Sequence, residues 1–250
     1  MIRVVLLGAG NVAAHVLKAF STTEKVNVVQ LYARSKESLL PFKNVVATTD
    51  TISDLVKADA YIIAVTDDAI GEVSAALSLK NALVVHTSGS ADINALLESH
   101  RKGVFYPLQT FTKGTTVDFS TIPICIEAEH NEDLLILEKL ASSISKAVYF
   151  IDSKQRESLH VAAVFVNNFT NHLYHIGQEI CNQNTVPFEV LKPLIQETAN
   201  KIKTMAPIDA QTGPAKRKDF GTITKHLHQL PSNYKDLYSL LTKSISDIYE

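Results

Sequence analysis

The chain of 250 residues has few of the features that mark secreted, metal-binding or nucleic-acid-binding proteins. Its only two cysteines, Cys125 and Cys181, lie far apart and match no metal or redox spacing. We therefore expect buried free thiols in a reducing cytosol, a cytoplasmic protein and no metal site. The net charge of -2 provides no field that would attract nucleic acid, so no nucleic-acid partner is expected.

One long stretch also lacks charge, which raises the question of a membrane span. Residues Ser158 to Gln178 include no Lys, Arg, Asp or Glu, but they include three Asn and three His. Amides and imidazoles are too costly for a helix that faces lipid, so this stretch predicts a buried helix of a soluble protein. The first apolar run is short and leads into a glycine motif, so we expect no cleavable signal.

The glycine motif GAGNVA follows the apolar run of residues 2–7 and opens an amphipathic helix. In this strand–turn–helix context, G-x-G-x-x-A is a dinucleotide fingerprint. Gly8 permits the tight turn, Gly10 lets backbone approach a pyrophosphate, and Ala13 lets the helix pack close to the strand. Free N–H groups at the helix start then face the phosphates. The predicted contacts are Gly8, Gly10, Asn11, Val12 and Ala13.

The second strand indicates which dinucleotide. An NAD site usually ends this strand in Asp or Glu, which binds the ribose 2′-hydroxyl. Here it ends in Arg34, Ser35 and Lys36. A guanidinium, a hydroxyl and an ammonium suit a 2′-phosphate, which favours NADP over NAD. The alternative is a solvated basic turn.

The order of predicted elements indicates the fold class. Strands are expected at 2–7, 26–33, 45–47, 59–65, 82–86 and 147–151, with edge strands at 103–106 and 122–127. Their β-branched runs, alternating with helices, predict a doubly wound Rossmann-type α/β sheet. Helices alone are expected afterwards, at 153–184, 188–205, 219–230 and 232–248. We predict a Rossmann domain over residues 1–152 and an all-α domain over 153–250.

The long predicted helix carries a stripe of neutral polar side chains. On a wheel of about 100° per residue, His160, Asn167 and Asn171 share one face with Val164, and His175 lies beside them. The apolar residues lie opposite: Leu159, Ala162, Phe165, Val166, Phe169, Leu173, Ile176 and Ile180. A solvated face would normally be charged. The stripe predicts either a substrate-facing cleft or a hydrogen-bonded structural or dimer seam.

Polar residues after the strands form a second candidate set. Thr66 and Asp67 follow one strand, and His86 and Ser88 mark the end of the next, on the side where such sheets bind ligands. Asp67 could instead cap a helix that begins at Asp68, and a histidine at a strand end can be structural.

Two further segments could complete a site. In Gln211–Arg217, Thr212 or Gly213 could cap a helix starting at Pro214, with Arg217 nearby to bind an anion. The polar turn Tyr106–Thr110 could line the same cleft or only link strands.

Several segments together resemble one bacterial family: GAGNVAAH, AVTDDAI, VVHTSGS, FYPLQTF, HVAAVFVNNFTNHLY and QTGPAKRKD. Members pair a Rossmann-like domain with a helical C-terminal domain of unknown function and are similar to deazaflavin-dependent NADP oxidoreductases. The fold also resembles pyrroline-5-carboxylate reductase and 3-hydroxyacid dehydrogenases, in which the helical domain forms a dimer and completes the active site. The resemblance implies this architecture and NADP binding, without a reaction. The catalytic lysine helix of the hydroxyacid dehydrogenases has no clear counterpart here.

The sequence therefore predicts an NADP-dependent oxidoreductase, a homodimer through its helical domain, that transfers hydride to or from a small carbonyl or imine substrate. His160, Asn167, Asn171, His86 and Ser88 are the expected catalytic residues, and Thr212, Gly213 and Arg217 the expected substrate-binding residues. The rival interpretations are a non-catalytic NADP-binding sensor or scaffold and a deazaflavin-coupled oxidoreductase.

Overall fold

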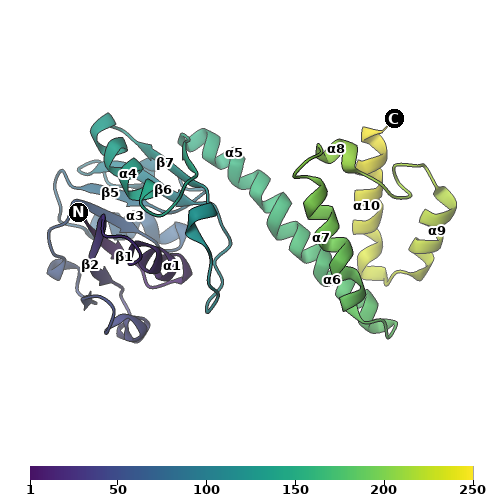
Figure 1. Ribbon diagram of the computed structural model, residues 1–250, viewed down its shortest axis with the longest axis horizontal. Coiled ribbons are helices and arrows are strands. Elements are labelled where there is room, and N and C mark those ends of the chain that lie inside the picture. The colour runs from purple at the N-terminus through teal and green to yellow at the C-terminus, as the bar shows by residue number, and fades with distance from the viewer. Residues whose placement is uncertain (250) are drawn as a thin grey trace. The chain divides into compact units, whose positions relative to one another are not determined.

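The computed structural model describes residues 1–249, and the first part of the chain is built around one sheet (Figure 1). Its strands are β1 (Ile2–Leu7), β2 (Val26–Tyr32), β3 (Thr48–Thr49), β4 (Ala60–Ile63), β5 (Leu83–His86), β6 (Arg101–Pro107), β7 (Ile124–Ala128) and β8 (Val148–Phe150). They lie in the order β3-β2-β1-β4-β5-β6-β7-β8. Every neighbouring pair is parallel except β6 and β7. This is the strand order of a doubly wound dinucleotide-binding sheet, so the predicted fold class is confirmed.

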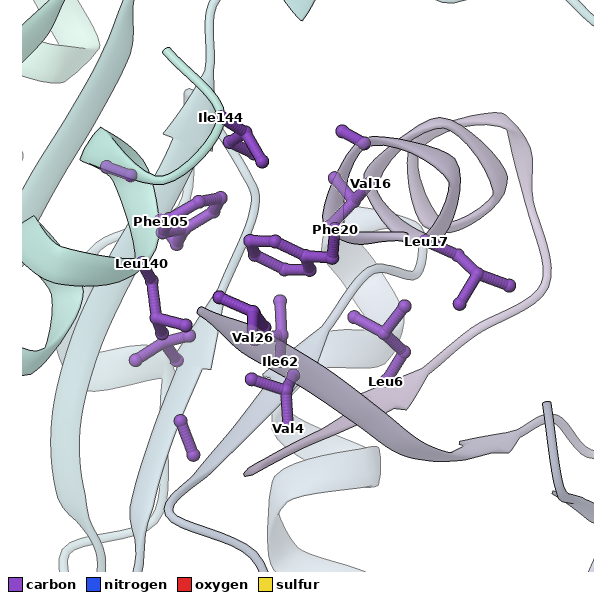
Figure 2. Close-up of a cluster of buried hydrophobic side chains, with 14 of the residues drawn as sticks. Val4, Leu6, Val16, Leu17, Phe20, Val26, Ile62, Phe105, Leu140 and Ile144 are labelled. Carbon is purple, nitrogen blue, oxygen red and sulfur yellow. The ribbon is translucent and has the colours of Figure 1, made fainter. Parts of the chain in front are cut away.

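Both faces of the sheet are covered, as continuous apolar strands require. Because successive side chains point to opposite faces, Leu6 joins the core shared with α1 (Asn11–Phe20) and α4 (Asn131–Ser142), whereas Leu7 joins the core shared with α3 (Ile70–Ala76). Figure 2 shows the first core, where the rings of Phe20 and Phe105 lie 6.0 Å apart. Burying each such side chain contributes about 1.5–3 kcal/mol to the stability of the fold. The packed cores hold the strands in place, and with them the loops that follow their carboxyl ends.

The second part of the chain contains helices only. Its α-helices are α5 (Ser153–Ala163), α6 (Thr170–Gln183), α7 (Lys192–Lys201), α8 (Pro207–Ala210), α9 (Phe220–Gln229) and α10 (Ser232–Ile248). The short helix α2 (Lys36–Leu39) belongs to the first part, between β2 and β3. Short 3-10 turns cover Leu40–Phe42, Ile52–Asp54, Asp67–Ala69, Ile93–Ala95, Phe119–Thr121 and Phe188–Leu191. A π-helical segment, Val164–Phe169, separates α5 from α6. The helical part begins at Ser153 because Asp152 and Gln155 form a capping box there.

Contacts divide the chain into two compact units, Met1–Thr170 and Asn171–Glu250. The first unit holds the whole sheet together with α5, and the second holds α7 to α10 and nearly all of α6. No helix in residues 1–249 is long and apolar enough to span a membrane. Within the same residues, no three His, Cys, Asp or Glu side chains gather as a metal site.

Three local predictions are wrong. Strands β6 and β7 are interior rather than edge strands, because β8 adds to the sheet beyond β7. Residues 214–218 form turns rather than a helix from Pro214, and the next helix starts at Phe220, capped by Asp219. The charge-free stretch is not a buried helix in the single chain, since Phe165 is 63% and Val166 is 75% exposed. Both cysteines are free and buried, as predicted.

Candidate functional site

The turn between β1 and α1 has the shape that a dinucleotide pyrophosphate needs. Gly8 adopts a φ of 128°, and a Cβ there would lie 2.1 Å from the Ala64 carbonyl oxygen. A Cβ on Gly10 would meet no atom within 4 Å, so the space above it is open. The first bond of the helix runs from Ala14 N–H to the Gly10 carbonyl. The amides of Asn11, Val12 and Ala13 precede that bond and are free to face an anion.

The end of β2 is basic and exposed. Arg34 and Glu72 form an ion pair of 3.4 Å in which both side chains are about two-thirds exposed. Lys36 pairs with Asp50 at 3.5 Å. Exposed pairs of this kind contribute little and exchange easily, so a phosphate can compete for both cations. Ser35 is the N-cap of α2, with its hydroxyl 3.4 Å from the Ser38 amide.

The turn after β5 is held by a short chain of hydroxyl groups. The Ser88 hydroxyl accepts hydrogen bonds from the Ser90 amide at 3.1 Å and the Ala91 amide at 2.9 Å. The Ser90 hydroxyl in turn donates to the carboxylate of Asp67, which follows β4. Asp67 therefore does not act as a helix cap: the 3-10 turn starts at Asp67 itself and Thr66 is its N-cap residue. The carboxylate ties the ends of β4 and β5 together instead.

His86 is fully buried at the end of β5 and is neutral. Burial, followed by the nearby charge of Arg156, lowers its pKa from 6.5 to about 4. Its Nδ1 accepts a hydrogen bond from the Ser88 amide at 3.2 Å, so the proton lies on Nε2. Nε2 is buried and meets no partner within strict hydrogen-bond geometry among the described residues, although a weak hydrogen bond to the backbone of Asp92 acts to raise the pKa of His86.

A tyrosine and a histidine meet over the β5 turn. The hydroxyl of Tyr106, at the end of β6, lies 3.4 Å from Nδ1 of His160 in α5, and the two rings are 6.4 Å apart. A Cβ on Gly89 would lie 2.6 Å from the Tyr106 ring and 2.7 Å from His160 Nδ1. A side chain at position 89 would overlap both rings, so glycine is needed for Tyr106 and His160 to pack against the turn. Burial raises the pKa of Tyr106, which keeps its hydroxyl protonated.

Helix α5 is fixed to the sheet by a buried arginine. Arg156 donates to the Glu127 carboxylate, to the Ser153 hydroxyl at 3.0 Å and to the Ala91 carbonyl at 2.6 Å. Its side chain has no exposed surface. Ala91 lies at the end of the turn after β5, and Glu127 lies on β7. By binding both, Arg156 fixes the position of α5, and therefore of His160, relative to Tyr106.

A cavity of about 480 Å³ opens beside the Tyr106–His160 pair, within the first unit. It lies between the loop after β6 and the helical wall of α5 and the π-helical segment. The lining residues are Tyr106, Leu108, Gln109, Thr110, Leu159, His160, Ala162, Ala163, Val164, Val166, Asn167 and Asn168. Its size is within the usual range for small-molecule sites, about 300–1,000 Å³.

The π-helical segment changes which side chains share a face. The wheel at 100° per residue holds only for an α-helix, whereas π-helical turns are wider. The cavity takes His160 and Asn167 from the predicted polar stripe and also Val166, which lies in the π-helical segment, from the predicted opposite side. Leu159, also from that side, lines the cavity from α5. Asn171 belongs to the second unit and is not part of this lining. Short π-helical segments occur often at functional sites.

The loop after β6 links the cavity to the dinucleotide turn. Gln109 and Thr110 line the cavity, and the next residue, Phe111, accepts a hydrogen bond at 3.0 Å from the side chain of Asn11. His15 adds a contact of 3.2 Å to the Thr115 carbonyl. The loop therefore touches α1 within its first two turns, next to the predicted pyrophosphate site.

The remaining predicted substrate residues lie in the second unit. Gly213 adopts a φ of 108°, Thr212 and Arg217 are exposed, and the segment between them forms turns. Their role in anion binding stays a prediction.

Sequence reasoning missed two members of the site. Tyr106 was expected only as part of a polar turn, although its place at a strand end was the available signal. Gly89 was not singled out, because its role depends on two side chains distant in sequence.

Comparisons with other proteins agree with this fold. A family model described as a domain of unknown function, DUF2520, matches residues 122–245. A solved structure of a "putative NADP oxidoreductase" from Bacteroides fragilis is 39% identical over 98% of both chains, with a TM-score of 0.87. This chain belongs to the same protein family as the Bacteroides protein. The predicted family resemblance is thereby confirmed.

More distant structures share the fold of this chain. A Thermotoga maritima protein is 21% identical, covers 98% of both chains and has a TM-score of 0.76. An imine reductase from Pseudomonas sp. is 14% identical over 97% of this chain and 92% of its own, with a TM-score of 0.67. At such identities the likeness shows the fold alone. A comparison with proteins of curated function finds no match.

Proposed function

We propose that this protein is an NADP-dependent oxidoreductase that transfers hydride to or from a small carbonyl or imine substrate. The observation that carries the proposal is one loop, residues 108–111. It forms a wall of the cavity through Gln109 and Thr110, and it binds the dinucleotide turn through Phe111 and Asn11. A substrate in the cavity would therefore lie close to a dinucleotide bound at Gly8 and Gly10. The name of the Bacteroides protein, which is 39% identical to this chain, supports the oxidoreductase class.

Different residues of the first unit would bind different parts of NADP. Gly8, Gly10 and the amides of Asn11, Val12 and Ala13 would hold the pyrophosphate. Arg34 and Lys36 would hold the 2′-phosphate, with Ser35 beside them. Thr66, Asp67, His86 and Ser88 stand at the carboxyl ends of β4 and β5, the side on which such sheets bind the cofactor. When bound, NADPH would donate the hydride or NADP⁺ would accept it, and the chain would supply orientation and proton transfer.

His160, Asn167 and Asn171 of the helical segment are proposed to face the substrate. The donors of His160 and Asn167 line the cavity and can hold a polar substrate group in one orientation. Thr212, Gly213 and Arg217 are proposed to bind a substrate carboxylate, and a homodimer formed through the helical part is proposed to complete the site. The dimer would also cover the apolar residues that the single chain exposes.

Replacing Asn167 by alanine tests the proposal directly. Asn167 is exposed in the cavity wall, so Asn167→Ala should abolish NADPH oxidation with a substrate found by metabolite-extract screening. NADPH affinity and melting temperature should stay near those of the native protein. Asn44→Ala, an exposed asparagine outside the cavity, is the matched control.

Other outcomes point to the alternative functions. A loss of about 1–3 kcal/mol in stability on Asn167→Ala would indicate a structural seam instead. NADPH binding without turnover of any extract would favour a sensor, and turnover only when a deazaflavin is added would favour a deazaflavin-coupled enzyme.

A further inference from the structure

The cavity beside Tyr106 is lined entirely by uncharged groups. Its polar atoms come from a phenol, an imidazole, a hydroxyl and three amides, on Tyr106, His160, Thr110, Gln109, Asn167 and Asn168. No Lys, Arg, Asp or Glu is part of this lining. Two carboxylates lie near but outside this lining. Glu127 is paired with Arg156 and accepts from Ser153, whereas Asp67 accepts from Ser90 and keeps its negative charge.

These surroundings distinguish two kinds of reduction. Reduction of an iminium ion begins with a cation, which an enzyme stabilises best with a carboxylate. Reduction of a ketone or aldehyde instead builds negative charge on oxygen, which N–H and O–H donors stabilise. A cavity that offers several neutral donors and no carboxylate suits the second reaction.

We propose that the reacting group of the substrate is an uncharged ketone or aldehyde and that Tyr106 is its proton donor. This inference rests on the proposed oxidoreductase function and names its substrate class. In the reducing direction, the carbonyl carbon gains a C–H bond from the reduced nicotinamide, and the π electron pair moves to oxygen. The oxygen takes the hydroxyl proton of Tyr106, and the alcohol leaves. The tyrosinate regains a proton from solvent through His160.

The geometry supports this role for Tyr106. Its ring lines the cavity, its hydroxyl lies 3.4 Å from His160, and Gly89 leaves the space that both rings occupy. The charged and titratable groups that act on it are the thiol of Cys125 and the carboxylate of Asp67, which raise its pKa, and Arg156, which lowers it. Burial is the largest cause and also raises the pKa, so the donor stays protonated at neutral pH.

The experiment compares carbonyl compounds with matched imines. The full-length protein with NADPH is tested against a panel of ketones and aldehydes, with and without a carboxylate elsewhere in the molecule, and the corresponding N-methyl imines and cyclic imines. The native protein should reduce members of the carbonyl set at least tenfold faster. Tyr106→Phe should lower kcat about 10²–10⁴-fold, the usual contribution of a positioned acid. Tyr149→Phe, which changes an exposed tyrosine of β8, should have no effect.

Binding provides a second readout that does not depend on turnover. Calorimetry should show that the reactive ketone binds the NADP⁺-saturated protein about tenfold more weakly after Tyr106→Phe and unchanged after Tyr149→Phe. Gly89→Ala should mimic Tyr106→Phe, because its methyl group occupies the place of the phenol and imidazole. NADPH affinity should be preserved in all three variants, and the melting temperature in the two tyrosine variants.

The results separate this inference from the proposed function. Preferential reduction of imines, or full activity of Tyr106→Phe on carbonyl compounds, overturns the inference while the oxidoreductase function stands. NADPH binding with no reaction across the panel and cell extracts overturns both.

Discussion

The two compact units bury very different amounts of apolar surface by themselves. In residues 1–170 the sheet and its helices enclose two cores, one on each face. In residues 171–249 the buried hydrophobic side chains are only Ile176, Cys181 and Ala215. Large apolar side chains there remain exposed, including Val190 at 66%, Leu194 at 62% and Phe220 at 69%. A helical unit with so small a core cannot offset the entropy of folding alone, whereas the sheet unit can.

This difference separates the sources of stability and function. The first unit contains the dinucleotide turn, the cavity and the Tyr106–His160 pair, all held by internal packing and hydrogen bonds. The second unit contributes mainly unpartnered apolar surface, which a second copy of the chain would cover. We therefore expect changes in the second unit to act through assembly and changes in the first unit to act through folding or ligand binding.

The largest expected effect comes from charges placed on the second unit. Val190→Asp combined with Leu194→Asp should convert a dimer into a monomer and cost about 5 kcal/mol or more of association free energy, because apolar contacts are lost and two charges are desolvated. The measurement is light scattering with melting curves at several protein concentrations. The helical signal should melt earlier while NADPH binding persists. A native protein that is monomeric at micromolar concentration would disprove the assembly.

The next largest effect lies in the first unit, at Arg156. Arg156→Met leaves the Glu127 carboxylate without its buried cation and should cost about 3–5 kcal/mol of unfolding free energy. The loss should be independent of protein concentration, unlike that of the double variant. Lys36→Met breaks an exposed pair and should cost under about 1 kcal/mol in the unliganded protein. Urea unfolding measures both, and equal losses would argue against the anchoring role of Arg156.

A pH-dependent effect follows from His86. Because its pKa is about 4 in the folded protein and 6.5 when unfolded, the unfolded state binds the proton first as pH falls. The contribution of His86 to the free energy of unfolding is fully present above pH 6.5. It is lost as the pH falls toward 4, and the total loss is about 3 kcal/mol. His86→Asn keeps an acceptor near the Nδ1 position and should flatten this part of the curve. Parallel curves for the two proteins between pH 4 and 7 would show that His86 does not cause the slope.

Much of the first unit could be predicted from sequence because its signals are local. The apolar run and GAGNVA give β1, the turn and α1, and the end of the strand signals before Ser153 gives the start of α5. The two compact units divide later, after Thr170. The strand at 147–151 was predicted, but its place in the sheet was not: it pairs with β7 as β8, so β6 and β7 are interior strands. Which strands pair is set by long-range contacts rather than by local sequence.

The candidate site was only partly predictable, for a physical reason. The wheel that grouped His160 and Asn167 assumed a uniform α-helix, and nothing local marks Val164–Phe169 as π-helical. The Tyr106–His160 pair joins residues 54 positions apart. Their meeting depends on the Arg156 anchor and on the space left by Gly89, which are tertiary facts.

The smallest expected effect tests whether nucleotide recognition belongs to the first unit alone. Arg34→Glu removes a charged hydrogen bond to a 2′-phosphate and should weaken NADPH binding by about 1.5–3 kcal/mol, roughly 10–150-fold. NADH binding should change little, because NADH has no 2′-phosphate. Since Arg34 pairs only weakly with exposed Glu72, Glu72→Gln is the matched control and should leave both affinities nearly unchanged. Calorimetry with each nucleotide gives the ratio. The loss should be equal in the native background and in the Val190→Asp, Leu194→Asp background. An equal loss for NADPH and NADH would remove Arg34 from the choice of cofactor, and a loss that depends on the background would show that the second unit takes part in nucleotide binding.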